Sequence, residues 1–185
     1  MPQKRDEYEL KQLLNLKSYS SIVNLLSGIE KQTIIQTNHY YDTHRFFLNS
    51  NNTTCRIREI NGQFQGTIKK HISGERSEEF EFDISFLPKT LLVDGMTVYS
   101  QGCATTERTI IPVSNTVTLF LDKTEYLGRT DYELEIEYEH NSRKCAEFIL
   151  TILLNACNIN RTKYILSKSQ RFFLQRIEGE TDEIF

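Results

Sequence analysis

The 185-residue sequence contains no tryptophan, only three prolines and only eight glycines. With so few chain-breaking residues, no low-complexity linker divides the chain, and this favours one domain over residues 1–185. The sequence also contains no glycine-rich phosphate loop. This absence excludes the P-loop class of nucleotide-binding site.

The four cysteines (Cys55, Cys103, Cys145 and Cys157) form no C-x-x-C pair and have no zinc-ligand spacing, and the four histidines are scattered. The amino-terminal segment has no apolar signal region. The longest apolar-rich stretch, Phe148 to Cys157, is too short to span a bilayer. These features predict a cytoplasmic protein with reduced thiols and without zinc.

The formal net charge of −3 provides no overall attraction to nucleic acid or to an anionic membrane. Any site for an anion must therefore be built locally. We expect a small-molecule partner, with no nucleic acid and no membrane, while a homodimer stays open as an alternative.

Charged residues at a spacing of two are the main feature that is present. Glu7, Glu9 and Lys11 alternate with Tyr8 and Leu10, so in a strand the three charged side chains share one face. Two carboxylates about 7 Å apart on one face repel each other unless a cation lies between them.

The acidic half of this pattern returns as Glu133, Glu135 and Glu137. Two acidic strands so far apart in sequence suggest that both bind the same ligand. A hard divalent cation, Mg²⁺ or Mn²⁺, is the natural one, because both ions prefer oxygen ligands.

Other segments repeat the spacing with cations or carboxylates. An ordinary sheet with one solvated face is the simpler interpretation of any single strand, but a solvated face has no need for repeated pairs of like charge. Arginine pairs are suited to a polyanion, because a guanidinium makes bidentate contacts to phosphate oxygens. The segments contain Arg56 and Arg58, Thr67 and Lys69, Glu79 and Glu81, Arg108, and Asp122.

Hydrophobic alternation predicts eight strands and few helices. The fold class is therefore α+β but mainly β: an eight-stranded antiparallel barrel resembling a tunnel, with a polar, charged interior and helices covering the outside. Helices are expected at about Ser18–Gln32, briefly after Pro88, at Ser142–Cys157, and from Lys163 to about Gln175. The strands are expected at about 5–13, 37–42, 53–60, 63–71, 78–84, 106–112, 116–124 and 131–139.

These motifs, in this order, resemble the CYTH superfamily, also called triphosphate tunnel metalloenzymes. Glu7-Tyr8-Glu9-Leu10-Lys11 is similar to its E-x-E-x-K signature, and Tyr40-Tyr41-Asp42-Thr43 to a further strand motif. The later charged pairs, the Leu127-Gly128 turn and the segment Ser167–Phe172 follow in order. The resemblance covers about residues 5–173 and is closest to small Gram-positive members.

The resemblance implies an active site inside the tunnel. Glu7, Glu9 and Lys11 would be catalytic, and Glu133 and Glu135 would complete the metal site, although Glu135 and Glu137 are an alternative pair. The implied metal ligands are Glu7, Glu9, Asp122, Glu133 and Glu135. The implied phosphate-binding residues are Lys11, Arg56, Arg58, Lys69, Arg108, Lys168 and Arg171.

Several functions remain open at this point. The first is divalent-metal-dependent hydrolysis of a triphosphate, with inorganic triphosphate as the simplest substrate and thiamine or nucleoside triphosphates as variants. The second is a class IV adenylyl cyclase that converts ATP to cyclic AMP, but no residue set indicates adenine recognition. A non-catalytic module that senses polyphosphate or nucleotides is less consistent with a second acidic strand.

Overall fold

A computed structural model of the chain describes residues 3–182. Within that range a single antiparallel sheet has the strand order β2-β3-β4-β5-β1-β9-β8-β7-β6, and β2 also pairs with β7. This extra pairing closes eight of the nine strands into a barrel, with β6 attached outside the ring. The strands are β1 (Gln3–Leu14), β2 (Gln32–Asp42), β3 (Thr53–Ile60), β4 (Gln63–His71), β5 (Arg76–Asp83), β6 (Thr90–Val93), β7 (Met96–Ser114), β8 (Val117–Tyr126) and β9 (Arg129–Tyr138).

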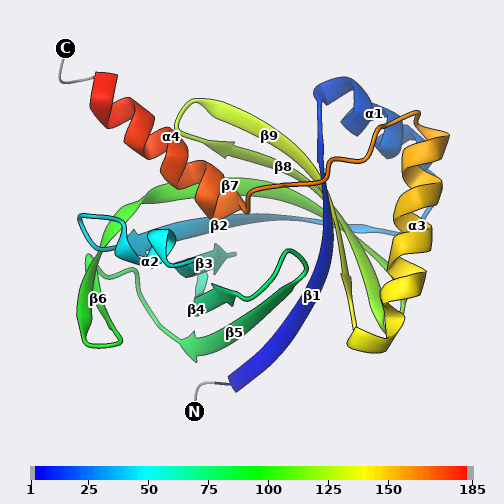
Figure 1. The fold of residues 1–185 in the computed structure, drawn as a ribbon. Helices are drawn as coiled ribbons and strands as arrows, with labels where there is room; N and C mark the ends of the chain where they lie inside the picture. Colours follow the sequence, from blue (N-terminus) through cyan, green and yellow to red (C-terminus); the bar gives the residue numbers. More distant parts are fainter. Residues whose placement is uncertain (1–2, 183–185) are drawn as a thin grey trace.

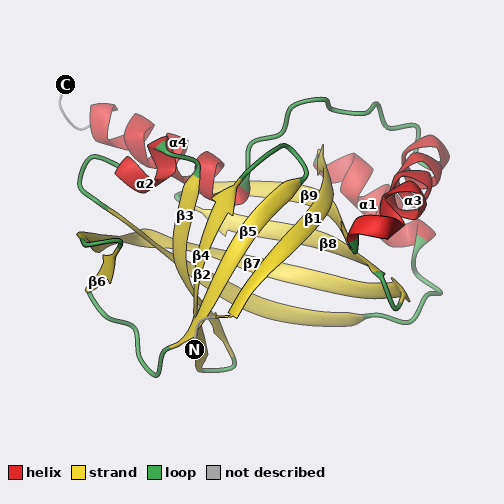
Figure 2. Cartoon of the chain, turned by 60° about the horizontal axis from the view of Figure 1, so that its bottom comes forward, coloured by secondary structure: helices red, strands yellow, loops and turns green. Residues whose placement is uncertain are grey.

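The helices lie outside the barrel in two groups (Figures 1 and 2). Helices α1 (Leu16–Leu25) and α3 (Arg143–Ala156) pack together at one end, and α2 (Phe47–Ser50) and α4 (Lys168–Asp182) lie at the other. A short 3-10 helix, His140–Ser142, leads into α3. The segment between α3 and α4 runs along the barrel and connects the two groups.

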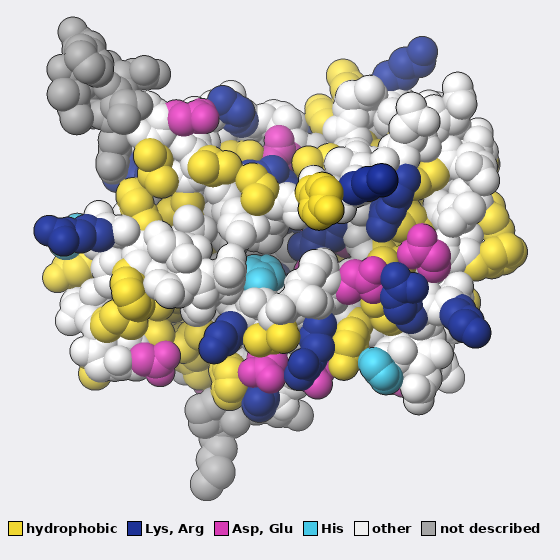
Figure 3. Space-filling view, viewed as in Figure 1, with side chains coloured by type: hydrophobic (Ala, Val, Ile, Leu, Met, Phe, Trp, Pro, Cys, Tyr) yellow, Lys and Arg dark blue, Asp and Glu magenta, His cyan; other side chains and the backbone are white. Residues whose placement is uncertain are grey.

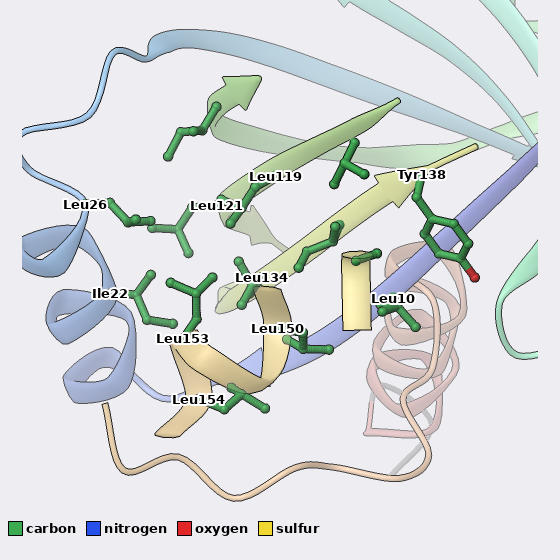
Figure 4. Packing of buried hydrophobic residues seen from close by; sticks show 14 of the residues in the cluster. Leu10, Ile22, Leu26, Leu119, Leu121, Leu134, Tyr138, Leu150, Leu153 and Leu154 are labelled. Carbon is green, nitrogen blue, oxygen red and sulfur yellow. The ribbon is translucent and has the colours of Figure 1, made fainter. Parts of the chain in front are cut away.

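The main hydrophobic core lies between the outer wall of the barrel and helices α1 and α3 (Figure 4). Leu10, Leu134 and Leu121 project outward from β1, β9 and β8 toward Ile22 of α1 and Leu150 of α3, and all five side chains are buried. Because side chains alternate along a strand, the residues on either side of each leucine in its own strand point inward. The outer core thus leaves the interior of the barrel free to be polar, as the sequence predicts.

Helix α4 closes one end of the barrel with aromatic side chains. Phe172 and Phe173 are buried against Tyr40 and Tyr126. The β7 backbone makes room for this contact at Gly102, which has φ +125°, because a Cβ there would lie 3.1 Å from the Phe172 ring. The start of α4 is therefore fixed over the tunnel.

Asp42 has a local structural role in the same region. Its carboxylate accepts hydrogen bonds from the backbone N–H groups of Thr43, Leu48 and Asn49 at 2.7–2.9 Å. It thereby satisfies the amides at the beginning of α2, which would otherwise lack partners.

Several sequence predictions need correction. The short helix expected after Pro88 is wrong: residues 90–93 form β6, joined to β7 by Asp94 and Gly95, both with positive φ, an Asp-Gly hairpin signal. The helix expected at 18–32 begins and ends earlier: Asn15 caps α1, the helix ends at Leu25, and residue 32 already begins β2. The expected helices at 142–157 and in the tail are confirmed, although α4 begins later, at Lys168.

The outer surface carries charges of both signs. Figure 3 shows basic and acidic side chains interspersed over one face. Among residues 3–182, no helix is long and apolar enough to cross a membrane.

Candidate active site

The interior of the barrel has an acidic wall and a basic wall. The acidic wall comes from neighbouring strands β1 and β9, whose register sets Glu9 opposite Glu137 and Lys11 opposite Glu135. The basic wall comes from β3 and β4, where Arg56 lies opposite Thr67. The cavity between the walls is lined by Glu7, Glu9, Lys11, Gln36, Asn38, Tyr40, Thr54, Arg56, Arg58, Lys69, His71, Arg108, Glu135, Glu137, Ser167, Lys168 and Ser169.

Two lysines occupy the space around the first acidic pair. Lys69 forms ion pairs with Glu7 and, at 3.3 Å, with Glu9. Lys11 lies 2.9 Å from Glu9 and 3.6 Å from Glu135. Burial alone would raise the pKa of Glu9, but Lys11 and Lys69 lower it to about 2. Glu9 is therefore ionised throughout the neutral range.

Glu137 is the least neutralised carboxylate of the acidic wall. Among the described residues it makes neither a hydrogen bond nor an ion pair, whereas Glu135 pairs with Lys11, Arg108 and Lys168. Burial, together with the negative charge of Glu7, raises the pKa of Glu137 to about 7. Burial is also the largest cause of the raised pKa of Glu7. A cation bound between Glu7 and Glu137 would offset the free-energy cost of burying their two negative charges.

The shifted pKa of Glu137 gives a testable pH dependence of stability without divalent metal. The folded state holds the proton more tightly than the unfolded state, where the pKa is near 4.5. The contribution of Glu137 to the free energy of unfolding should therefore fall by on the order of 3 kcal/mol as the pH rises from about 4.5 to 7. Urea denaturation in EDTA should show that Glu137→Gln gains stability relative to wild type over this interval.

His71 does not obscure this comparison. Its pKa is lowered to about 4 by burial, Lys69 and Lys11, so it contributes the opposite slope, but to both proteins. Glu107→Gln, on an exposed carboxylate of β7 that does not line the tunnel, is the matched control. A constant stability difference between Glu137→Gln and wild type from pH 4.5 to 7 would contradict the raised pKa of Glu137.

The basic wall contains a guanidinium without an acidic partner. Arg58 donates to the Asn38 side-chain oxygen at 3.2 Å and makes no ion pair with any described residue. Burial, with Arg56 and Arg108 nearby, lowers the pKa of Arg58 to about 9. Arg56 lies 3.6 Å from Glu79, and its buried Nε has no hydrogen-bond partner among the described residues. Glu79 also pairs with Arg5 and Lys69, so it balances interior cations.

A second ion-pair group ties α4 to the barrel. Lys168 lies 2.9 Å from Asp122, 2.8 Å from Glu133 and 2.6 Å from Glu135. Arg171 lies 2.9 Å from Glu133, and Arg108 lies 2.6 Å from Asp122. Asp122, Glu133 and Arg171 therefore form part of the α4 contact and do not line the tunnel cavity. The residues expected from sequence thus divide between the cavity and its closed end.

The donor chemistry of the acidic wall fits a hard divalent cation, because Glu7, Glu9, Glu135 and Glu137 offer carboxylate oxygens. Within residues 3–182, no three acidic, histidine or cysteine side chains already surround one point. Lys11 and Lys69 lie among these carboxylates instead, and the cavity measures about 50 Å³, which is room for a few water molecules. Binding of a metal and an anion must therefore draw the lysines off the carboxylates.

Sequence reasoning missed the uncharged part of the lining. His71, to which the sequence assigns no role, lines the cavity. The alternation of Thr67 and Lys69 on β4 could have identified it, since residue 71 continues the same face. The hydroxyl and amide residues carry no comparable signal. They are Gln36, Asn38, Tyr40, Thr54, Ser167 and Ser169.

The chain forms a closed antiparallel barrel, and inside it an acidic wall faces a basic wall. These two features define the class of tunnel-fold proteins. The profile of the CYTH domain family matches residues 5–173. The chain belongs to the CYTH family.

Individual relatives agree with this assignment. YjbK of Bacillus subtilis (strain 168), which carries the provisional name triphosphatase, is 28% identical over 161 residues, covering 78% of this chain and 84% of YjbK. A Bacillus halodurans protein provisionally named an adenylate cyclase has a similar structure, with TM-score 0.74 and 25% identity over 92% of this chain and 98% of that one. HpAC1 from Hippeastrum shares the fold, with TM-score 0.67 and 21% identity over 97% and 96% of the two chains.

Proposed function

We propose that the protein is a divalent-metal-dependent hydrolase of a small triphosphate, with inorganic triphosphate as the first substrate to test. One observation carries this proposal. The tunnel holds a guanidinium without an acidic partner, Arg58, and a carboxylate without a cationic partner, Glu137, both largely buried among the described residues. A metal–triphosphate complex would supply both the cation that Glu137 lacks and the anion that Arg58 lacks.

The acidic wall is the proposed metal site. We assign Glu7, Glu9, Glu135 and Glu137 to it. Glu137 replaces the Glu133 expected from sequence, because Glu137 lines the cavity whereas Glu133 lies outside it, in the contact with Arg171. The same reasoning assigns Asp122 to the contact with Arg108 and Lys168.

The cations of the tunnel are the proposed phosphate contacts. Arg56 and Arg58 on β3 present guanidinium groups that suit phosphate oxygens. Lys69 and Lys11 lie between the two walls and would move from carboxylate to phosphate oxygens as the complex binds. Arg108 and Lys168 line the same cavity near Glu135 and would neutralise the remaining charge.

This arrangement supports phosphoryl transfer without a nucleophilic side chain. Phosphoryl transfer depends mainly on positioning and charge stabilisation. A bound Mg²⁺ or Mn²⁺ supplies Lewis-acid stabilisation and lowers the pKa of a water molecule. The residues of the chain fix the phosphate groups in line along the tunnel and exclude bulk water from them.

A cyclase is the second candidate, because the Bacillus halodurans relative is provisionally named an adenylate cyclase. Against it, the HpAC1 structure is described as revealing a dominant triphosphatase activity in a protein first considered a cyclase. YjbK, by name, also favours hydrolysis.

Product identification tests the proposal. Purified protein is incubated with inorganic triphosphate, ATP or thiamine triphosphate, each with Mg²⁺, Mn²⁺ or EDTA. We expect orthophosphate from inorganic triphosphate in the presence of either metal and none in EDTA. Cyclic AMP with pyrophosphate as the product from ATP would establish the cyclase instead, and no product with any substrate would favour a binding module.

Arg56→Ala should weaken substrate binding without unfolding the protein. It removes one of the guanidinium groups that face the phosphates, and we expect KM for inorganic triphosphate to rise about tenfold. The defect should shrink with added salt, because salt screens the attraction between Arg56 and the phosphates that only the wild type has. Steady-state kinetics at two salt concentrations measures it.

Arg45→Ala, at an exposed arginine that does not line the tunnel, is the control. A KM defect of Arg56→Ala that does not change with salt would indicate a structural role for Arg56.

A further inference from the structure

His71 is fixed at the end of the basic wall. It is the last residue of β4 and lies opposite Ser77 of β5. Its backbone N–H donates to the Asn52 carbonyl oxygen at 2.9 Å. Because two neighbouring segments hold the backbone, the imidazole has a defined place on the inner face, continuing the row of Thr67 and Lys69.

The two ring nitrogens of His71 differ in their surroundings. Nδ1 lies 3.2 Å from the Oγ atom of Ser77, a side chain that is itself buried. Nε2 is also buried, but it has no hydrogen-bond partner among the described residues. Buried polar atoms without a partner are uncommon in folded proteins and call for an explanation. A ligand that supplies the missing partner is one.

The position of His71 relative to the cavities points to the same explanation. His71 lines the tunnel and also a chamber of about 510 Å³ beneath residues 161–167. Glu9, Lys11 and Ser167 are also shared by both cavities. The imidazole therefore stands where the tunnel opens into the chamber, at the end of any chain of phosphates that lies in the tunnel.

The charges around His71 select an anion as the ligand. Its pKa is lowered to about 4 by burial and by Lys69 and Lys11, and the ring is therefore neutral at pH 7. A neutral imidazole carries one N–H. If the Ser77 hydroxyl donates to Nδ1, the proton is on Nε2, which then becomes a hydrogen-bond donor beside two lysines that attract phosphate.

We propose that His71 is a substrate-contacting residue whose Nε2–H donates a hydrogen bond to the phosphate at the chamber end of the substrate, with Ser77 holding the tautomer. This inference rests on the proposed triphosphate substrate. It adds a neutral donor to a set of contacts that otherwise consists of charged groups.

Two substitutions at His71 separate substrate contact from a structural role. His71→Phe keeps an aromatic ring but removes the donor, and KM for inorganic triphosphate should rise about tenfold with kcat close to wild type. His71→Gln places an amide near the Nε2 position and should recover most of the affinity. His39→Phe is the matched control, because His39 of β2 pairs with Glu59 and does not line the tunnel. A wild-type KM for His71→Phe would overturn the proposal. Equal losses of affinity in His71→Phe and His71→Gln that parallel a fall in Tm would also overturn it.

A spectroscopic readout makes the test independent of turnover. In ¹⁵N-histidine-labelled protein, Nε2 of His71 should have the ¹⁵N chemical shift of a protonated nitrogen. The signal is assigned by its loss in His71→Phe. Inorganic triphosphate, added with Ca²⁺ in place of Mg²⁺ or Mn²⁺, should move this signal. If wild type releases no phosphate but this shift occurs, the hydrolase proposal fails while the contact stands. An unprotonated Nε2, or no shift at saturating triphosphate, overturns the contact.

Discussion

Glu9→Gln is expected to lower kcat for metal-dependent triphosphate hydrolysis by at least about a hundredfold, the scale found when one electrostatic contact to a transition state is removed. Glu9 is buried and lies on the acidic wall between two lysines. The amide is nearly isosteric, but it carries no charge for a divalent cation. Phosphate release in saturating Mg²⁺ or Mn²⁺ measures the effect, and Glu7→Gln should give a similar loss.

The fold should survive this substitution, because each lysine keeps another carboxylate. Lys69 retains Glu7 and Glu79, and Lys11 retains Glu135. Glu107→Gln, on the exposed outer face of β7, is the matched control and should leave kcat unchanged. A folded Glu9→Gln variant with wild-type phosphate release would remove Glu9 from the metal site.

Lys168→Met is expected to destabilise the protein by about 3 kcal/mol or more at pH 7, because removing one partner leaves buried charges uncompensated. Lys168 lies within 2.9 Å of Asp122, Glu133 and Glu135. Arg108 and Arg171 still contact these carboxylates, but they cannot replace the third cation. Urea denaturation of variant and wild type measures the difference.

The loss should shrink toward pH 3 to 4. Burial alone would raise the pKa of Glu135, but Lys168, Arg108 and Lys11 lower it well below its usual range. A lowered carboxyl pKa contributes stability above the unfolded pKa and loses it as the pH falls. Lys144→Met, on the exposed side of α3, should stay within about 0.5 kcal/mol of wild type. An equal loss for Lys168→Met at both pH values would exclude the carboxylate cluster as its cause.

The closed barrel and its polar interior were predictable because they depend on local alternation. Residues at a spacing of two share a strand face whatever the partner strand, so Glu7, Glu9 and Lys11 had to share a wall. The eight expected strands correspond to the eight that close the ring. The β6 hairpin was missed because the turn signal at Asp94 and Gly95 follows a proline that also suits the start of a helix.

The depth of each residue along the tunnel could not be predicted in the same way. Glu133, Glu135 and Glu137 have the same alternation and therefore the same face. The choice among them depends on the register with β1, which sets Glu137 opposite Glu9, and on Arg171, which reaches Glu133 from α4. Both are contacts between segments far apart in the chain.

Anomalous scattering from Mn²⁺ in crystals that contain inorganic triphosphate would test the metal–triphosphate site most directly. We expect a manganese peak bound by carboxylate oxygens from the set Glu7, Glu9, Glu135 and Glu137, with phosphate density that reaches Arg56 and Arg58. A peak between Asp122 and Glu133, or phosphate density outside the barrel, would contradict the proposed site.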